Sequence, residues 1–373
     1  MEERSPSVAD VLSVIEAWAP REIAWQKDNV GHLVGRRGVE VRRILVALDV
    51  TEDVIAEARH IGAQLLVTHH PLIFQPILSV TDQSRVGRLL LRLTESNIAL
   101  IAAHTNLDFS KDGVSMALAR ALGLQELRFL HTEQGKLEKI AVFVPRDYVD
   151  TVSEAMARAG AGIIGEYSNC SFRVEGTGTF KPSERAHPFV GSAGTLEHVD
   201  EIRLEMILPS WKRLDVIEAM KAVHPYEEVA YDVYPLLNAD PNYGAGVIGR
   251  LPKPARAESF LRHIRRQLHV EHLRYVKGKS STIQSVAVCG GACSDLIKSA
   301  IEQNADALVT ADISYHTFQE AEGSIFLIDA GHFETEVVIV NPFAYRLEKE
   351  LEKRGFSVSV VVSKQMKNPI QWL

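Results

Sequence analysis

The sequence predicts an α/β protein made of two α/β halves, with an α+β domain inserted between them. Short apolar segments alternate with helical segments over residues 44–103, which favours parallel β-α-β units. The same alternation returns after about residue 243. Between the halves, the pattern changes to the β-α-β-β-α-β order of ferredoxin-like domains. We therefore predict segments at residues 1–131, 132–242 (the inserted domain) and 243–373.

Composition sets the class of the protein before any motif is considered. The 373 residues carry a formal charge of -7, which argues against a nucleic-acid-binding protein. The N-terminus lacks the apolar core of a signal peptide, and no apolar run is long enough to span a bilayer. Cys170, Cys289 and Cys293 form an odd set without a disulfide framework, which indicates a reducing, cytoplasmic location.

The first half begins with a helix that Ser7 caps. Residues 26–40 are rich in glycine and charged side chains and are predicted as turn and loop. Buried strands are then predicted at residues 44–48, 65–68 and 98–103, and helices at residues 51–62 and 86–93.

The middle segment contains a complete set of strands and helices of its own. Strands are predicted at residues 140–144, 201–208 and 231–234, helices at 148–159 and 211–223, and a long loop at 176–189. The segment at residues 224–228 reads HPYEE, and we expect it to pack and orient a strand edge rather than bind a metal.

The second half repeats the strand and helix alternation. Strands are predicted at residues 285–289, 307–310, 325–328 and 358–362, and helices at 255–268, 295–303 and 332–354. Residues 244–249 match the G-x-G-x-x-G pattern of dinucleotide-binding folds. Pro252 and Pro254 follow, however, and prevent the helix that would hold a pyrophosphate. Cys289 and Cys293 are expected to be buried structural residues, although their spacing also allows a redox or metal-binding role.

Potential metal ligands follow three of the predicted strands. His69 and His70 follow the strand at 65–68, and Asp108 lies shortly after the strand at 98–103. His332 and Glu336 lie four residues apart at the start of a helix and therefore share one face of it. Parallel strands end at one edge of a sheet, where ligands bind. Each residue alone has a structural explanation as a polar loop residue, but together they favour a metal site.

Three imidazoles and two carboxylates exceed what one closed structural zinc site needs. They suit two divalent cations that hold a bridging water, whose pKa falls until hydroxide is available near neutral pH. In an extended loop the side chains of His69 and His70 point in opposite directions, so we expect each to serve a different ion, with Asp108 bridging both. Mixed histidine and carboxylate ligation fits Zn, Fe, Mn or Co.

Other polar residues lie near the same predicted strand ends. His104 is a candidate general acid/base or a partner that orients a ligand, with a structural role as the alternative. Asp312 and His316 are predicted to line the pocket, with helix capping as the alternative. Thr105 and Asn106 are candidates to contact a substrate or to satisfy the backbone. For Asp28 we expect an Asx-turn.

These motifs resemble the NIF3-like family, whose members are also named GTP cyclohydrolase 1 type 2 homologs. The matching stretches are THHPLIF, HTNLD, GHFETE and DNVGHLVG. The middle segment, with GTGTFKPSE and HPYEEVAYDVYPL, resembles the CutA/PII-like insert of the longer bacterial members. The resemblance implies a NIF3-like fold whose two halves surround a dinuclear metal site, with the five residues His69, His70, Asp108, His332 and Glu336 as ligands. It also implies a toroidal homohexamer.

The resemblance further implies hydrolytic opening of the guanine imidazole ring of GTP, with His104 moving protons. Our first hypothesis is therefore that the protein is a metal-dependent hydrolase of a nucleotide or related small molecule. The second is a regulatory or adaptor protein whose insert senses a small molecule or binds a protein partner. A nucleic-acid role is the third, and the acidic charge argues against it. No membrane partner is expected.

Overall fold

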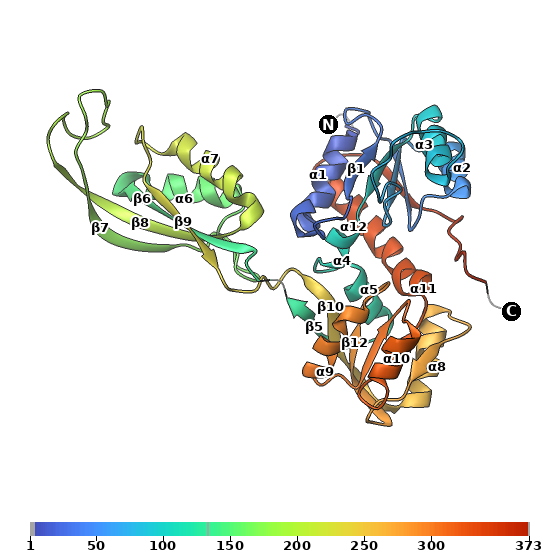
Figure 1. Cartoon of the computed structure of the whole chain (residues 1–373). Helices are drawn as coiled ribbons and strands as arrows, with labels where there is room; N and C mark the ends of the chain where they lie inside the picture. Colours follow the sequence, from blue (N-terminus) through green and yellow to red (C-terminus); the bar gives the residue numbers. More distant parts are fainter. Residues whose placement is uncertain (1–3, 133, 372–373) are drawn as a thin grey trace. The chain divides into compact units, whose positions relative to one another are not determined.

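The computed structural model describes residues 4–132 and 134–371. It shows a mixed α/β fold with three sheets, which confirms the predicted fold class. The chain divides into two compact units (Figure 1). One consists of Met1–His131 with Asn242–Leu373, and the other is Thr132–Pro241, which we call the inserted domain.

The N-terminal part of the first unit is built on a five-stranded sheet. In spatial order its strands are β1 (Gly31–Val34), β4 (Ala99–Ala102), β3 (Leu65–Thr68), β2 (Arg43–Ala47) and β15 (Ser359–Val362). All neighbours are parallel except β1, which is antiparallel to β4. Helices α1 (Val8–Trp18) and α12 (Val340–Lys353) pack on one face, and α2 (Glu52–His60) and α3 (Arg85–Glu95) on the other.

A six-stranded sheet forms the second part of the same unit. In spatial order its strands are β11 (Arg274–Val276), β14 (Phe326–Asp329), β13 (Ala307–Thr310), β12 (Thr282–Val288), β10 (Gly244–Arg256) and β5 (Gln125–Thr132). The central strands β12, β13 and β14 are parallel. Helices α5 (Val114–Ala121) and α8 (Ala257–Leu268) share one core with the sheet, and α9 (Ile297–Glu302) and α10 (Tyr315–Ala321) share another.

Two helical segments carry the chain between these sheets. The first leaves β4 through α4 (Thr105–Asp108) and α5 and enters β5. The second leaves β14 through α11 (His332–Glu336) and α12 and enters β15. Helix α5 contacts α11, so the two segments meet between the sheets. This meeting point is where the predicted ligands lie.

The inserted domain has the order β6 (Leu137–Pro145), α6 (Val149–Arg158), β7 (Phe172–Phe180), β8 (Glu197–Pro209), α7 (Arg213–Val223) and β9 (Tyr231–Leu236). Its four strands are antiparallel, in the spatial order β7-β8-β6-β9. The order of elements is that of the split β-α-β motif. Its core lies between the two helices and one face of the sheet.

Several strands differ from the sequence prediction. Strand β1 lies in a segment predicted as loop, and β7 covers residues 172–180, the last five of which fall in the predicted loop at 176–189. Both are edge strands, and β7 is almost entirely exposed, so neither has the apolar alternation that marks a half-buried strand. The helix predicted at 332–354 is interrupted by a 3₁₀ turn at Val337–Ile339.

None of the helices in the described part of the chain is both long enough and apolar enough to cross a membrane.

Candidate metal centre

The candidate site lies at the carboxyl ends of parallel strands from both sheets of the first unit. Asp49, His70 and His104 follow β2, β3 and β4, and Gly291, Asp312 and His332 follow β12, β13 and β14. The two sets meet at the rings of His70 and His332, whose centroids lie 5.4 Å apart, and His70 also forms an ion pair with Glu336 of α11. The loops of two separate sheets therefore build one site, in accordance with the general position of ligand sites in α/β folds.

The tandem histidines point toward the same centre, which corrects the prediction that they point apart. Their ring centroids lie 4.9 Å from each other, and both Nε2 atoms approach Glu336, at 3.9 Å from His69 and 3.0 Å from His70. The alternation of side chains holds only within a strand, and β3 ends at Thr68. Beyond it the backbone bends, and the Thr68 hydroxyl donates a hydrogen bond to the His70 carbonyl (2.8 Å).

The four imidazoles of the site share one hydrogen-bonding pattern. The Nδ1 atom of His69 lies 2.8 Å from the Ala103 carbonyl. In the other three, a carboxylate takes the place of the carbonyl, in the pairs His70–Asp49 (2.9 Å), His104–Asp28 (2.9 Å) and His332–Asp312 (2.6 Å). Carbonyls and carboxylates accept hydrogen bonds, so each Nδ1 must carry the proton. Each Nε2 is thereby left facing the centre, as in histidines that bind metals.

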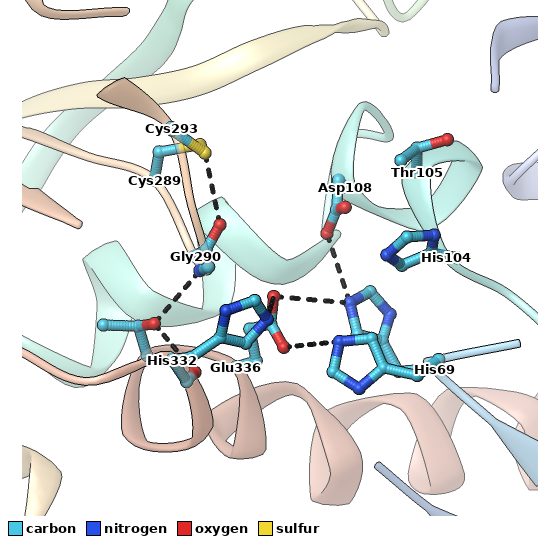
Figure 2. Close-up of polar contacts among 12 residues, drawn as sticks. His69, His104, Thr105, Asp108, Cys289, Gly290, Cys293, His332 and Glu336 are labelled. Carbon is cyan, nitrogen blue, oxygen red and sulfur yellow. Dashed lines mark hydrogen bonds and ion pairs between the residues drawn. A yellow bond between two sulfur atoms is a disulfide. The ribbon is translucent and has the colours of Figure 1, made fainter. Parts of the chain in front are cut away.

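Glu336 approaches three of these imidazoles, those of His69, His70 and His332, and is almost completely buried (3% exposed). Its Oε1 is 3.1 Å from His332 Nε2 (Figure 2), and its Oε2 is 3.0 Å from His70 Nε2. Burial opposes ionisation, but hydrogen bonds with the surrounding histidines hold the pKa of Glu336 well below its ordinary value. Glu336 is therefore a permanent negative charge in the interior, and a charge of this kind needs a cation or a proton beside it.

Among the described residues, two buried polar atoms of the site have no hydrogen-bond partner, His69 Nε2 and Asp108 Oδ1. They lie 3.6 Å apart, too far for a hydrogen bond, and Glu336 Oε1 approaches the same His69 nitrogen at 3.9 Å. Buried polar atoms are nearly always satisfied, and nitrogen and carboxylate oxygen are ligands for divalent transition metals. The unsatisfied atoms and the donor set both fit a bound metal ion.

The electrostatics of the protein without a cation are consistent with this interpretation. Burial acts against protonation of His70, but hydrogen bonds with Asp49 and Glu336 raise its pKa to about 10. A hydrogen bond with Glu336 is the main cause that raises the pKa of His332 to about 9. Burial raises the pKa of Asp108 to about 7. Protons thus take positions that a divalent cation would otherwise occupy.

Among the residues that the structure describes, two groups of three ligand-type side chains have their ligand atoms within 4.8 Å of one another. One is His69, His70 and His104, and the other is His70, His332 and Glu336. His104 thus belongs to the site itself, whereas the sequence suggested proton transfer or an orienting role. Asp108 contacts His69 but is in neither group.

Asp28 fixes the orientation of His104, a role that the sequence did not reveal. Besides the His104 contact, its carboxylate accepts hydrogen bonds from the Thr105 backbone N–H (3.1 Å) and hydroxyl (2.5 Å). Burial opposes ionisation, but hydrogen bonds with His104 and Thr105 lower the pKa of Asp28 to about 2. The Thr105 side chain therefore positions Asp28. Asn106 is also buried, and its side-chain amide donates to the Ala19 carbonyl (2.7 Å).

The turn after β12 packs closely against the Glu336 carboxylate. Gly291 has a φ of 68°, and a Cβ atom there would collide with Glu336 Oε1. Its N–H donates to the buried Thr335 hydroxyl (3.1 Å), which in turn donates to the Gly331 carbonyl (2.8 Å). The turn and helix α11 are thereby tied together. Only glycine combines this backbone conformation with this close approach.

The cysteines that flank this turn are joined in a disulfide, which corrects the prediction of unpaired structural cysteines. Cys289 and Cys293 have Cα atoms 6.1 Å apart, within the range that a disulfide spans. The intervening Gly290-Gly291 turn produces this approach, which spacing alone did not reveal (Figure 2). Cysteine content consequently no longer argues for a reducing compartment.

The two remaining predicted pocket residues have different positions. The Asp312 carboxylate accepts a hydrogen bond from His332 Nδ1. Asp312 also borders a cavity of about 700 Å³ that His332 and Arg274 line. His316 lies on exposed α10, edge-to-face with Tyr315, and is not among the residues that line this cavity. The cavity gives a small molecule access to His332.

Comparison with known proteins identifies the family. The sequence model described as Duf34/NIF3 (NGG1p interacting factor 3) matches residues 6–369. The chain belongs to the Duf34/NIF3 family. A protein from Halalkalibacterium halodurans named GTP cyclohydrolase 1 type 2 homolog is 39% identical over 365 residues, covering 97% of this chain and 98% of the relative. A Bacillus subtilis protein of the same name is 36% identical, with 99% and 100% coverage.

Solved structures show the same family likeness. A Bacillus cereus protein described as related to NIF3 superposes with a TM-score of 0.89 at 37% identity, covering 99% of this chain and 100% of that one. A Staphylococcus aureus protein superposes with a TM-score of 0.80 at 28% identity, with 99% of both chains covered. The NIF3 architecture therefore extends over the whole length of this chain, including the inserted domain.

Replacing Gly291 by alanine is expected to weaken metal binding through Glu336. The new methyl group displaces the carboxylate, so we expect metal affinity to fall about tenfold or more, as when a residue that orients a ligand is changed. Gly323→Ala is the matched control because Gly323 has a similar φ of 74° but open space around it. Both variants should lose about 1 kcal/mol of folding free energy from the positive φ. Equal metal content in the two variants after dialysis would contradict the assignment.

Metal binding to the cation-free protein is expected to release protons. Because the pKa values of His70 and His332 are raised to about 10 and about 9, both rings are protonated at neutral pH until a cation displaces the protons. Binding should therefore release about two protons per chain from these rings and a further fraction from Asp108, whose pKa is about 7, and affinity should fall as the pH is lowered. Calorimetric titration with Zn²⁺ in buffers of different ionisation enthalpy measures this number. Zero proton release with pH-independent affinity would show that these rings are not ligands.

Proposed function

We propose that this protein is a metal-dependent hydrolase of a nucleotide or a related small molecule. The observation that supports this proposal most strongly is that the Nε2 atoms of His69, His70 and His332 face Glu336 while an acceptor holds the Nδ1 of each ring. A purely structural cluster has no need for buried unsatisfied atoms, and the cavity that His332 lines gives a small molecule access to this residue.

We assign two divalent cations to the site, with Zn, Fe, Mn or Co as the candidates. Their proposed ligands are the five predicted residues, namely His69, His70, Asp108, His332 and Glu336. One oxygen of Glu336 lies 3.0 Å from His70 Nε2 and the other lies 3.1 Å from His332 Nε2, which supports this number. When bound, such a pair supplies Lewis-acid activation of water near neutral pH.

His104 is proposed to carry protons during the reaction. Its Nδ1–H is held by the buried carboxylate of Asp28, so its Nε2 is the position that accepts or donates a proton. The fixed ring orientation keeps Nε2 directed at the site. Phe74 lies edge-to-face with His104 (6.3 Å) and shields one side of the ring.

GTP is the first substrate to test, because the relatives carry the name GTP cyclohydrolase 1 type 2 homolog. The proposed reaction is hydrolytic opening of the guanine imidazole ring. The cavity beside His332 is lined by both signs of charge, and its Arg274 is already paired with Asp329. It therefore lacks the cationic surface that a triphosphate prefers. For this reason nucleosides and nucleobases belong in the same assay.

The metal-loaded protein is expected to hydrolyse at least one member of a panel of GTP, other nucleotides, nucleosides and nucleobases. His69→Ala should lose both metal and activity, because it removes a ligand. His104→Ala and Asp28→Asn should keep the metal content and lower kcat by about 10²-fold or more, as for a general acid/base and the residue that orients it. A His104→Ala variant that loses metal would make His104 a ligand. Absence of turnover over the whole panel would contradict the hydrolase.

A regulatory or adaptor role is the second candidate, and the cavity in the inserted domain favours it. The discriminating result is ligand binding by the inserted domain combined with no turnover at the metal centre. As part of this second candidate function, we propose that the inserted domain is CutA/PII-like.

We also propose that the chain assembles with copies of itself, with a toroidal homohexamer as the expected form. The loop after the tandem histidines exposes several apolar side chains, and Leu78 is fully exposed while Phe74 and Val80 are about half exposed. Contiguous exposed apolar residues are typical of interfaces. Light scattering should give about six times the chain mass, and Leu78→Asp should reduce it. A wild-type protein that remains monomeric would contradict this proposal.

A further inference from the structure

The inserted domain contains a cavity of about 420 Å³ that has no part in the proposed hydrolysis. Its floor includes Phe143 of β6, Gly178 of β7 and Glu201 of β8, and the segments around Phe189 and Tyr226 cover it. A volume of this size is within the range of small-molecule sites. All the lining residues belong to the inserted domain, so this domain forms the cavity by itself.

Glu201 places a buried carboxylate in this cavity. Its neighbour Ile202 belongs to the core between the sheet and the helices, so the Glu201 side chain points to the opposite face. Glu201 is only 8% exposed, and no Lys or Arg forms an ion pair with it within the part of the chain that the structure describes. A Cβ atom on Gly178 would collide with this carboxylate, so glycine provides the room that Glu201 occupies.

The Tyr226 hydroxyl interacts with Glu201 but does not neutralise it. The Tyr226 hydroxyl is buried and makes no hydrogen bond of good geometry with any described residue. Burial and the neighbouring Glu201 charge both raise the pKa of Tyr226, so the hydroxyl remains neutral. A phenol next to a carboxylate leaves the negative charge in place. Burying an unpaired carboxylate is costly, and a bound cation removes that cost.

Aromatic rings form the remaining walls. The Tyr226 ring lies 6.0 Å from Phe180 and 6.3 Å from Phe189, measured between centroids, and both pairs are tilted rather than stacked. Tilted rings around one space present several faces to it, which is the arrangement that binds organic cations. Phe143 is less available, because Arg203 lies over its ring at 5.9 Å and is itself paired with Glu205 (2.9 Å).

Hydrogen bonds of His224 hold the HPYEE segment (residues 224–228) against strand β6. The Tyr226 backbone N–H donates to His224 Nδ1 (3.1 Å), so Nε2 of that ring carries the proton and donates to the Phe143 carbonyl (3.1 Å). Burial lowers the pKa of His224, which keeps the ring neutral. His224 thus fixes Tyr226 against β6.

The charges around the cavity favour a cation. Glu227 and Glu228 line it in addition to Glu201, and Lys181 is the basic side chain among the lining residues. Glu227 also accepts a hydrogen bond from the His187 N–H (2.9 Å), which ties the covering loop to this segment. Three carboxylates against one exposed ammonium leave the lining with a negative balance.

We propose that the inserted domain binds a small organic cation, an amine or quaternary ammonium compound, with its charge on Glu201 and its apolar body among Phe180, Phe189 and Tyr226. A hydrated metal ion is a poorer match, because one buried carboxylate with aromatic walls lacks the oxygen ligands that such ions need. An anion is excluded by Glu201. This site is separate from the metal centre, so it does not depend on hydrolysis there.

Calorimetric titration of the full-length protein with choline, tetramethylammonium and spermidine tests the proposal. We expect at least one of these cations to bind with one site per chain. The neutral isostere of choline, 3,3-dimethyl-1-butanol, should bind about tenfold more weakly or not at all, because it has the same shape without the charge. Glu201→Gln should weaken cation binding about tenfold or more, whereas Glu218→Gln on the exposed face of α7 should leave it unchanged.

Thermal unfolding separates a binding role of Glu201 from a structural one. Without ligand, Glu201→Gln should have the same Tm as the wild type or a higher one, because it removes an unpaired buried charge. With cation, only the wild type and Glu218→Gln should gain stability. No binding by any of the three cations, equal binding of the neutral isostere, or a lower Tm of ligand-free Glu201→Gln would each overturn the proposal.

Discussion

The structure of the first unit depends on the contact of Glu336 with the histidines around it. With every Nδ1 engaged by an acceptor, the Nε2 atoms of neutral His70 and His332 would direct lone pairs at carboxylate oxygens only 3.0 and 3.1 Å away. That arrangement is stable only with positive charge between the atoms, either as protons or as a metal ion. The loops after strands of two sheets are held together at this point, so the positive charge is also a structural requirement.

The wider fold explains how this contact is made. Each sheet presents the carboxyl ends of its parallel strands to the site, and the segments through α4 and α11 cross between the sheets there. Asp28 precedes β1 at the same end of the antiparallel β1–β4 pair as His104 and orients that ring, and Gly291 leaves room for Glu336. The site residues therefore come from distant parts of the sequence. Each imidazole ring is oriented by the single acceptor that binds its Nδ1. The inserted domain has its own core and its own cavity.

The sequence was sufficient to predict the α/β halves and the residues that the site brings together, because buried strands and the polar residues after them are local patterns. It did not predict Asp28 and Asp49 as partners of His104 and His70, since those pairs depend on which strands are neighbours. The direction of the tandem histidines was predicted wrongly, because the strand ends at Thr68, one residue before them. Edge strands such as β7 were missed since exposure removes their apolar alternation. The disulfide depends on the shape of a glycine turn, which spacing does not specify.

The most direct test of this account is a crystal structure of the metal-loaded protein with anomalous scattering data collected at the metal absorption edge. We predict anomalous peaks bounded by the Nε2 atoms of His69, His70 and His332 and by the carboxylates of Asp108 and Glu336, at metal–nitrogen distances of about 2.0–2.2 Å. Full-length protein that is saturated with metal and shows no peak at Glu336, or shows peaks only elsewhere, would contradict the account.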